Sequence, residues 1–347
     1  MKVCIVTVYN SINSGSYWQA FSLGKYLKEN GHEVYYYKRN NKGASASLCE
    51  KMKHIISLLI RFKFKAMVNY LKTIRDFTIC NKNFNIIDEG EIDKIDLFIL
   101  GSDTIWNLDT KYFTNNRKVY FGGAFQNKKK ISYAASVANT KIETLNKYSE
   151  IKTYLNDIFK ISVRDKHTKE VISNLINKEI NIVCDPTLLL TKNEYEKLLT
   201  NNEEKNYIFL YLFKDLNEKH IIEVKKFAKE NNLKIISGIK DCKWCDKSIV
   251  NAPQNFLNYM YNAQYVITDT FHGTIFSVNL NKNFIAINRN KNKVNEFLNK
   301  CNLNDRLISN QDIKQIFDKT IDYSFVNKIL DEYRKESIEF LNNSLKD

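Results

Sequence analysis

The chain has 347 residues, a length that predicts two domains rather than one. Hydrophobic residues make up 44% and aromatic residues 13%, with only 10 glycines and 2 prolines, which excludes a disordered or a collagen-like chain. The formal net charge of +14 favours anionic partners such as phosphorylated small molecules, an acidic polymer or a membrane surface.

The sequence predicts a soluble protein of the cytoplasm. The apolar run at residues 1–10 is too short for a signal peptide, and no segment reaches the ~18 uninterrupted apolar residues of a membrane span. Seven scattered cysteines in a long chain predict reduced thiols. Cys242 and Cys245 form a single C-x-x-C without a second pair, so we expect neither a zinc site nor redox activity there.

Apolar, strand-like runs alternate with helical patterns, which predicts parallel sheets with crossover helices. The first series has expected strands at 2–8, 33–38, 97–100, 130–134, 160–163 and 180–183, with a helix over 17–29 that ends at Gly31. The segment 191–205 is polar and weakly helical. The second series has expected strands at 207–212, 234–237, 265–268 and 284–287, with a helix over 217–231. Residues 324–343 predict a long amphipathic helix.

Two such series predict an α/β fold with two doubly wound, Rossmann-like domains that face a cleft. We expect the first domain at 1–190, the second at 206–322, and a C-terminal helix at 323–347 that could pack back on the first domain. Ligands of doubly wound sheets bind at the carboxyl ends of the strands. The loops that follow the strands are therefore where functional residues are expected.

His272 follows the expected strand 265–268 and precedes an expected helix over 274–279. An imidazole beside the first backbone N–H groups of a helix suits a phosphate or carboxylate ligand and could move a proton. The alternative is a turn histidine that only caps the helix. The surrounding sequence, Thr-Asp-Thr-Phe-His-Gly, favours the functional interpretation.

Asp103 lies in the loop after the expected strand 97–100, between Gly101 and Trp106. Its carboxylate could orient or deprotonate a hydroxyl group, and the indole of Trp106 could stack on a sugar ring. The alternative is a capping role for Asp103 with Trp106 buried in the core.

Arg164 ends the strand 160–163 and could bind a carboxylate or phosphate with two parallel hydrogen bonds. A surface pair with Asp165 is nearly as compatible with the spacing. The turn at Asp185 is interpreted as the close of the first domain. The loop 13–16 could bind a polar ligand, but the chain has no dinucleotide or P-loop motif and no Asp-x-Asp pair.

Residues 51–75 combine Ile, Leu, Phe and Met with eight Lys, Arg or His and no Asp or Glu. This composition fits a helix on an anionic membrane surface, and so a peripheral contact with the inner membrane face, or a helix that closes over an acidic ligand. An ordinary amphipathic helix packed on the sheet is the alternative. The chain lacks a nucleic-acid-binding motif, so nucleic acid is not an expected partner.

Four motifs occur in order along the chain: GSDTIWN at 101–107, ISVRD at 161–165, DPTLL at 185–189 and ITDTFHG at 267–273. Together they resemble the polysaccharide pyruvyl transferase family. The opening Asn13-x-Gly15 with Gln19, and a closing region from Lys293 to Arg306, are similar to further motifs of that family. The resemblance covers about residues 3–310.

The resemblance implies a two-domain fold of the GT-B glycosyltransferase type. It also implies phosphoenolpyruvate as co-substrate and a cyclic pyruvate ketal across two hydroxyls of a sugar, in a surface polysaccharide or its lipid-linked precursor. No cofactor and no metal are expected, so a chelator should leave activity intact. The alternatives are a glycosyltransferase that takes a nucleotide sugar on the same fold, and a membrane-associated scaffold without activity.

The roles that follow from the resemblance fall into three groups. The catalytic residues are His272 and Asp103. The donor-binding residues are Arg164, Thr270, Gly273, Thr274 and Lys293, with the helix-terminal N–H groups of Gly273 and Thr274 on the phosphate. The acceptor-binding residues are Asn13, Gly15, Gln19, Ser102, Trp106 and Asn107. Thr270 stands where some relatives have Arg, so a second donor-binding cation must come from elsewhere, with Lys293 or Arg289 as candidates.

Overall fold

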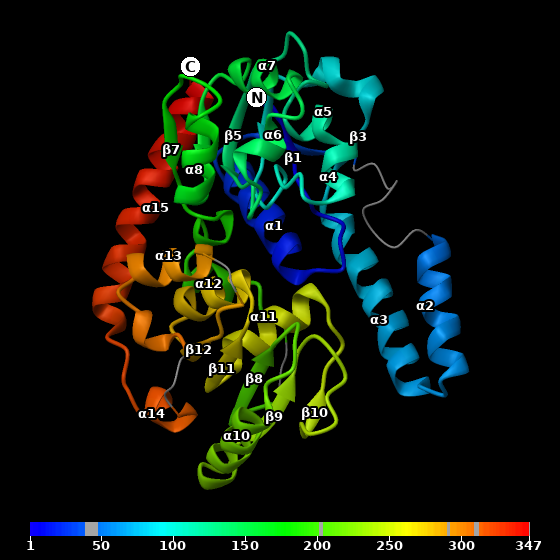
Figure 1. The fold of residues 1–347 in the computed structure, drawn as a ribbon, viewed down its shortest axis with the longest axis vertical. Coiled ribbons are helices and arrows are strands. Elements are labelled where there is room, and N and C mark those ends of the chain that lie inside the picture. The colour runs from blue at the N-terminus through cyan, green and yellow to red at the C-terminus, as the bar shows by residue number, and fades with distance from the viewer. Residues whose placement is uncertain (39–47, 201–203, 290–291, 309–311, 347) are drawn as a thin grey trace.

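The computed structural model describes residues 1–38, 48–200, 204–289, 292–308 and 312–346. The described chain contains two sheets whose strands are all parallel, one of seven strands and one of five, and each belongs to its own domain (Figure 1). This is the predicted α/β architecture with two Rossmann-like domains. The predicted polar segment near residues 191–205 joins them.

The N-terminal domain is built on the seven-stranded sheet, in the order β3-β2-β1-β4-β5-β6-β7. Its strands are β1 (Lys2–Val6), β2 (Glu33–Tyr37), β3 (Ile86–Ile87), β4 (Leu97–Leu100), β5 (Lys130–Ala135), β6 (Ile161–Val163) and β7 (Ile180–Ile182). The central strands β1 and β4 are apolar and buried, apart from Lys2 at the start of β1, because helices cover both faces of the sheet. The helices are α1 (Ser14–Glu29), α2 (Leu48–Ile60), α3 (Phe64–Cys80), α4 (Lys111–Asn115), α5 (Arg117–Tyr120), α6 (Ile142–Leu145), α7 (Glu150–Asn156), α8 (Lys166–Ser173) and α9 (Lys192–Glu196).

The C-terminal domain is built on the five-stranded sheet, in the order β10-β9-β8-β11-β12. Its strands are β8 (Tyr207–Tyr211), β9 (Lys234–Ser237), β10 (Lys247–Ser248), β11 (Tyr265–Thr268) and β12 (Asn283–Ala286). Its helices are α10 (Glu218–Glu230), α11 (Pro253–Asn262), α12 (Phe271–Asn279), α13 (Asn292–Lys300) and α14 (Ile313–Phe317).

The predicted strands all occur, most of them within one or two residues of their expected bounds. The two-residue edge strands β3 and β10 were not predicted, because two residues carry no alternating pattern. Gly31 ends α1 with a φ of +80°, the left-handed conformation that glycine adopts most readily. Helix α12 begins at Phe271, three residues before its predicted start, so His272 lies in its first turn rather than in the preceding loop.

One hydrophobic core extends across both domains. It contains Trp18 of α1 and Tyr195 after β7 from the N-terminal side, together with Phe276 of α12 from the C-terminal side. The rings of Trp18 and Phe276 lie 6.4 Å apart, and the Trp18 indole donates a 2.9 Å hydrogen bond to the carbonyl of Pro253. The two domains therefore share apolar surface rather than meeting only through polar loops.

The last helix, α15 (Tyr323–Lys346), runs along one side of both domains (Figure 1). The hydroxyl of Tyr333 donates to the carbonyl of Val183 at 3.0 Å, and the Arg334 guanidinium donates to the carbonyl of Leu188. Arg334 also reaches the side-chain oxygen of Asn279 in the C-terminal domain at 3.3 Å. The helix thus packs back on the N-terminal domain while it contacts the C-terminal one.

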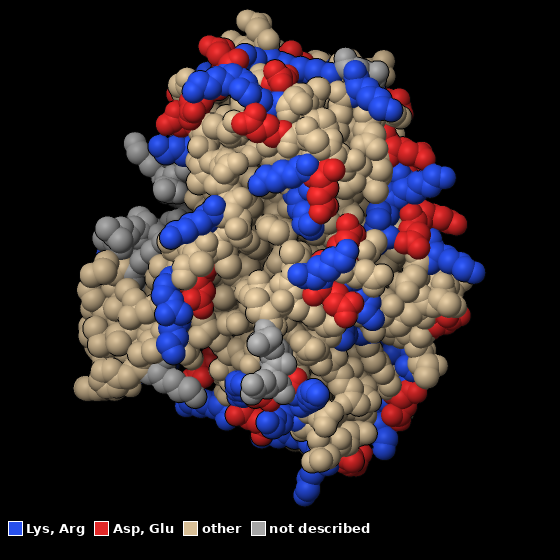
Figure 2. Space-filling model, turned by 180° about the vertical axis from the view of Figure 1, so that it is seen from behind, with Lys and Arg blue, Asp and Glu red and all other residues tan. Residues whose placement is uncertain are grey.

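The sequence pattern suggested a single helix over residues 51–75, but these residues form two helices. They belong to an antiparallel pair, α2 and α3, that turns at residues 61–63 and projects from the side of the molecule opposite α15 (Figure 1). From behind, positive and negative side chains mix over most of the surface, whereas the face of the hairpin lobe seen in this view is mostly uncharged (Figure 2). None of the helices in the described ranges is long and apolar enough to cross a membrane.

The expectation that every cysteine is reduced is not met, because Cys242 and Cys245 are joined in a disulfide in the loop between β9 and β10. The two cysteines are three positions apart in the sequence, and the backbone of the loop brings their Cα atoms to 5.5 Å. Cys4, Cys80, Cys184 and Cys301 are free thiols.

Candidate active site

Four loops meet where the two sheets face each other. In the N-terminal sheet β1 lies between β2 and β4, and in the C-terminal sheet β8 lies between β9 and β11, so each sheet has its switch of strand order at this edge. Ligands of doubly wound sheets bind at such switch points. The loops after β1, β4, β8 and β11 line a cavity of about 300 Å³ there, with Ser16, Asp103, Phe213 and His272 among its walls.

His272 enters this cavity from the first turn of α12. Its Nε2 atom lies 3.5 Å from Oδ2 of Asp185, a carboxylate that is completely buried. The other side of the ring packs on Gly15, where an added Cβ atom would lie 2.3 Å from Nδ1. A carboxylate on one side and a glycine on the other therefore fix the position of the imidazole.

Arg164 is also buried, and it lines a neighbouring, larger cavity. Its Nη1 donates a 2.9 Å hydrogen bond to Oδ2 of Asp185, and its Nη2 lies 3.8 Å from Oδ1 of Asp103. Its guanidinium carbon is 4.7 Å from the ring centre of Phe271. Within the described ranges, Nε and Nη2 of Arg164 have no hydrogen-bond partner. The side chain thus has donors left for a ligand, and it is not part of the surface pair with Asp165 that the spacing also allowed.

Asp103 adopts a φ of +72°, a left-handed conformation that is uncommon outside glycine and often found at functional sites. Its Oδ2 accepts a 2.8 Å hydrogen bond from the hydroxyl of Ser16, and its Oδ1 accepts one from the N–H of Thr104. The carboxylate therefore faces the cavity with both oxygens held in place.

Both buried carboxyls are kept ionised. Burial raises the pKa of the Asp103 carboxyl, but the charges of Arg164, His272 and Lys293 and the Ser16 hydrogen bond outweigh burial, and the pKa is below its ordinary value. The pKa of Asp185 is lowered more strongly. Burial opposes this shift, while His272, Arg164 and the N–H of Thr187 produce it. For Arg164, burial lowers the pKa, and its three neighbouring carboxylates reverse the effect and raise it.

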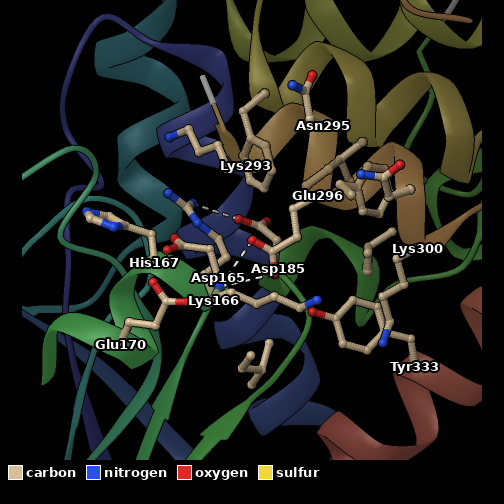
Figure 3. Close-up of a pocket in the computed structure, with 17 residues that line it drawn as sticks. Asp165, Lys166, His167, Glu170, Asp185, Lys293, Asn295, Glu296, Lys300 and Tyr333 are labelled. Carbon is tan, nitrogen blue, oxygen red and sulfur yellow. Dashed lines mark hydrogen bonds and ion pairs between the residues drawn. The ribbon is translucent and has the colours of Figure 1, made fainter. Parts of the chain in front are cut away.

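Lys293 connects this cavity to a second one. Its ammonium group lies 5.0 Å from the ring centre of Phe271, and it borders the second cavity of about 710 Å³ between α8, α13 and α15 (Figure 3). Lys166, His167 and Lys300 line this larger space, and Glu296 accepts hydrogen bonds from the N–H of Lys166 across the domain boundary. The two cavities share Phe271 and Lys293, so one ligand could extend from one into the other.

Two predicted donor contacts, those of the Gly273 and Thr274 N–H groups, are corrected by the geometry of α12, whereas Thr270 does line the smaller cavity. The hydroxyl oxygen of Thr270 accepts the N–H of Gly273 at 2.8 Å, and the carbonyl of Thr270 accepts the N–H of Thr274 at 3.1 Å. Thr274 is buried as well. Because the first N–H groups of a helix have no partner within it, those of Phe271 and His272 are the ones left for an anion.

Three predicted acceptor contacts are also corrected. Trp106 is fully buried, donates its indole N–H to the carbonyl of Tyr120 and stacks on Phe121, so it cannot stack on a sugar. Gln19 and Ser102 are buried and bond to each other at 3.0 Å. Gln19 also binds backbone oxygens on either side of the first loop, which makes these two residues supports of the site rather than ligands.

The remaining acceptor candidates lie in different places. Asn13 lines the 300 Å³ cavity and caps α1 through its side-chain oxygen, which accepts the N–H groups of Gly15 and Ser16. Gly15 serves by leaving room for His272. Asn107 accepts a hydrogen bond from the hydroxyl of Thr140, away from the residues that border the cavity.

Asp185 and Ser16 belong to the site and were not assigned to it from the sequence. Asp185 does form the predicted Asp-Pro turn, since its Oδ1 accepts the N–H of Thr187 at 3.0 Å, but its other oxygen binds Arg164. Its position at the end of β7 was the signal that could have identified it. Within the described ranges, no group of three or more His, Cys, Asp or Glu side chains could hold a metal ion.

The fold and the site define a class: an enzyme-like α/β protein of the GT-B type, with a charged site between two Rossmann-like domains. The structure of UDP-GlcNAc 2-epimerase from Neisseria meningitidis bound to UDP-GlcNAc is similar, with a TM-score of 0.52, 10% identity and 100% of each chain covered. A second UDP-N-acetylglucosamine 2-epimerase gives a TM-score of 0.52 at 10% identity, over 97% of this chain and 89% of that one. At this identity the similarity concerns the fold.

The family follows from the sequence itself. The sequence model of the polysaccharide pyruvyl transferase family matches residues 13–291, most of the chain, so the protein belongs to that family. No functionally curated protein matches it significantly. The matched region contains Asp103, Arg164, Asp185 and His272, and so includes the charged centre of the site.

Proposed function

We propose that the protein transfers the pyruvyl group of phosphoenolpyruvate to two hydroxyls of a sugar, in a surface polysaccharide or its lipid-linked precursor. The product is a cyclic pyruvate ketal, and no cofactor takes part. The observation that carries this proposal is that His272 lines the smaller cavity, Arg164 lines the larger one, and Lys293 borders both, in a member of the pyruvyl transferase family.

The reaction requires that the methylene carbon of phosphoenolpyruvate gain a proton and that C2 form two bonds to sugar oxygens. The C2–O bond to phosphate breaks, and its electron pair leaves with the phosphate. Of the two hydroxyl protons released by the sugar, one balances the proton added to the methylene carbon and the other leaves on hydrogen phosphate. The site must therefore supply an acid, stabilise positive charge at C2 and accept hydroxyl protons.

We assign the proton transfer to His272. Its ring is held between Asp185 and Gly15 and faces the cavity, as a group that moves a proton in a fixed direction must be. Asp185 acts as a positioning residue, because its carboxylate is buried and binds Arg164 and the histidine on the same oxygen.

We assign to Asp103 the role of the base that accepts a proton from the acceptor hydroxyl. Its lowered pKa makes it a weak base in the resting site. A hydroxyl that adds to the electron-poor C2 becomes strongly acidic during the step, so a weak base that is already in place is sufficient. Ionised Asp103 also stabilises the positive charge that develops on C2.

The donor carries three negative charges, and the charge of Arg164 is largely compensated by Asp185 and Asp103. The additional positive charge for binding must come from Lys293 and the N-terminus of α12. Some relatives have an arginine at the position of Thr270, and we propose that Lys293 supplies this positive charge instead. Arg289 is less suited, because it is not among the described residues that line either cavity.

The experiment is thermal unfolding of the purified protein with phosphoenolpyruvate, phosphate, pyruvate and a series of nucleotide sugars. A ligand that binds only the folded state raises the melting temperature in proportion to its occupancy. We expect a saturable increase with phosphoenolpyruvate, and release of phosphate when acceptor is present. His272→Gln should keep the increase and lose the phosphate release.

A nucleotide sugar is the second candidate donor, since the fold is shared with a structure that contains UDP-GlcNAc and the 710 Å³ cavity has room for a nucleotide. Stabilisation by a nucleotide sugar without stabilisation by phosphoenolpyruvate would replace the proposed reaction with glycosyl transfer.

A further inference from the structure

The hairpin of α2 and α3 exposes apolar side chains at its turn. Ile60 is 71% exposed, Phe62 80% and Phe64 54%, and the rings of Phe62 and Phe64 contact each other. Further along both helices the exposed apolar residues are Met52, Ile56, Leu59, Val68, Leu71 and Ile79. So many large, exposed apolar side chains on one helical hairpin are uncommon in monomeric proteins and indicate a binding surface.

Basic residues accompany this apolar surface. Arg61 and Lys63 lie in the turn itself, Lys53 on α2 and Lys72 on α3, and all four are exposed. Between residues 51 and 75 the chain contains no Asp or Glu. A protein partner that covered only the apolar side chains would not explain the absence of acids, whereas an anionic bilayer surface accounts for both properties.

The base of the hairpin is fixed to the body of the protein. Helix α3 packs against α11, Phe77 is buried in the core shared by the two domains, and Asn83, just after α3, donates to the hydroxyl of Tyr17 in α1. The turn lies at the opposite end, away from the seven-stranded sheet (Figure 1). The hairpin therefore presents its turn on a rigid support.

The hairpin also borders the loop that leads into the site. Leu58 of α2 and Tyr70 of α3 line a cavity of about 250 Å³ together with Ile12 and Asn251. Ile12 precedes Asn13, which lines the active-site cavity, and Asn251 accepts a hydrogen bond from Ser14 at 3.3 Å. A surface bound to the hairpin would thus lie next to the side of the cleft that we assign to the acceptor.

We propose that the turn of this hairpin, residues 59–64, inserts into the interface of an anionic membrane. The rings of Phe62 and Phe64 enter among the lipid headgroups, and Arg61 and Lys63 bind the negative headgroups. This contact holds the cleft close to the membrane. In combination with the proposed reaction, it names a lipid-linked acceptor.

The test is flotation of the purified full-length protein with vesicles of phosphatidylcholine alone or with phosphatidylglycerol added. We expect binding to the phosphatidylglycerol vesicles only, weakened by salt. Phe62→Ser with Phe64→Ser, and separately Arg61→Gln with Lys63→Gln, should each weaken it about tenfold or more.

Matched controls come from α10, on the C-terminal domain. Ile222→Ser replaces an apolar residue that is 66% exposed, and Lys225→Gln with Lys226→Gln removes two exposed charges. Both controls should bind vesicles like the wild type. All replaced side chains are exposed, so the melting temperatures should stay close to that of the wild type.

No binding to phosphatidylglycerol vesicles, or equal loss in the α10 controls, would overturn the membrane assignment. So would a dimer in light scattering that the double serine variant converts to a monomer, because the surface would then be an interface between two copies. Vesicle binding needs neither donor nor acceptor. Failure of phosphoenolpyruvate to bind would therefore remove the proposed reaction without affecting the vesicle result.

Discussion

The imidazole of His272 packs directly on Gly15, across the boundary between the two domains. A Cβ atom at position 15 would lie 2.3 Å from Nδ1 and 2.5 Å from Cγ of the histidine ring. Position 15 must therefore be a glycine if the imidazole is to keep its place. The loop after β1 contributes to the site because Gly15 leaves room for the His272 ring. This contact also explains why motifs 257 positions apart in the sequence (272 minus 15) belong to one site.

Gly15→Ala should reduce turnover strongly. The added methyl group displaces the imidazole, and a shift of about 1 Å in a catalytic group costs about a hundredfold in rate. The control is Gly90→Ala, where the nearest atom to the added Cβ would be 3.6 Å away, an ordinary contact distance. Steady-state phosphate release measures both variants. Equal rates in Gly15→Ala and wild type would remove His272 from the proton-transfer role.

Asp185 makes the folded state sensitive to acid. Its pKa in the folded protein lies below the ordinary 3.8, because His272 and Arg164 outweigh the opposing effect of burial. The stability from this shift is complete above the ordinary pKa and is lost as the pH falls from there toward the folded value, since the unfolded chain binds the proton first. We expect the urea midpoint of the wild type to decrease over that range.

Asp185→Asn tests the same carboxylate at neutral pH. The variant leaves the buried charge of Arg164 without its closest partner, which should lower the free energy of unfolding by about 3 kcal/mol. It should also lack part of the acid dependence, since an amide does not titrate. Urea unfolding as a function of pH measures both effects, and parallel curves for variant and wild type would contradict the assignment to Asp185.

Trp106 should matter for stability and not for donor binding. It is fully buried against Phe121, and replacing such a side chain by Ala costs about 4 kcal/mol through the cavity that remains. Trp106→Ala should therefore lower the melting temperature and keep the increase caused by phosphoenolpyruvate. Trp244→Ala, at a half-buried position, is the comparison and should lose less stability. A stable Trp106→Ala variant with weakened sugar binding would restore the stacking hypothesis.

Lys293 and Arg289 form a matched pair of cations. Lys293→Gln should raise the half-saturating concentration of phosphoenolpyruvate about tenfold or more, the usual effect of losing one charged contact. Arg289→Gln should leave that concentration near the wild-type value, since Arg289 is not among the described residues that line either cavity. The reverse order of the two effects would transfer the donor-binding role to Arg289.

The shared hydrophobic core predicts how the protein unfolds. Trp18, Tyr195 and Phe276 belong to the same core although they come from two domains. A large apolar interface couples domains that would otherwise move and unfold separately. Calorimetry should therefore give one transition, with equal calorimetric and van't Hoff enthalpies. Two resolved transitions would contradict this coupling.

The strands were predictable because buried parallel strands appear as short, uninterrupted apolar runs between turn signals. β4, β9 and β11 match their predicted bounds, whereas the edge strand β10 has only two residues and gives no such signal. The hairpin was not predicted because residues 51–75 show continuous helical periodicity. The turn at Phe62, whose φ is +52°, occurs without a glycine or proline to mark it.

Within the site, the position of a residue after a strand could be predicted from the sequence, but the direction of its side chain could not. His272, Asp103 and Arg164 each follow a strand, so the topology predicted that they would lie at the same edge. Whether Trp106 points to the cavity or to the core, and whether Gln19 meets a ligand or Ser102, depends on rotamers that the sequence pattern does not contain. Asp185 was assigned only to a turn because one of its oxygens does form that turn.

The core that joins the two domains also restricts which chimeras could be made by exchanging one domain with that of a related protein. A cut in the linker near residue 200 would expose Trp18 and Tyr195 on one fragment and Phe276 on the other, along with the α15 contacts to both. Neither half is a portable module. In a working chimera, both faces of the apolar interface would have to come from the same parent protein. The ligand preferences of the two domains would therefore be exchanged together.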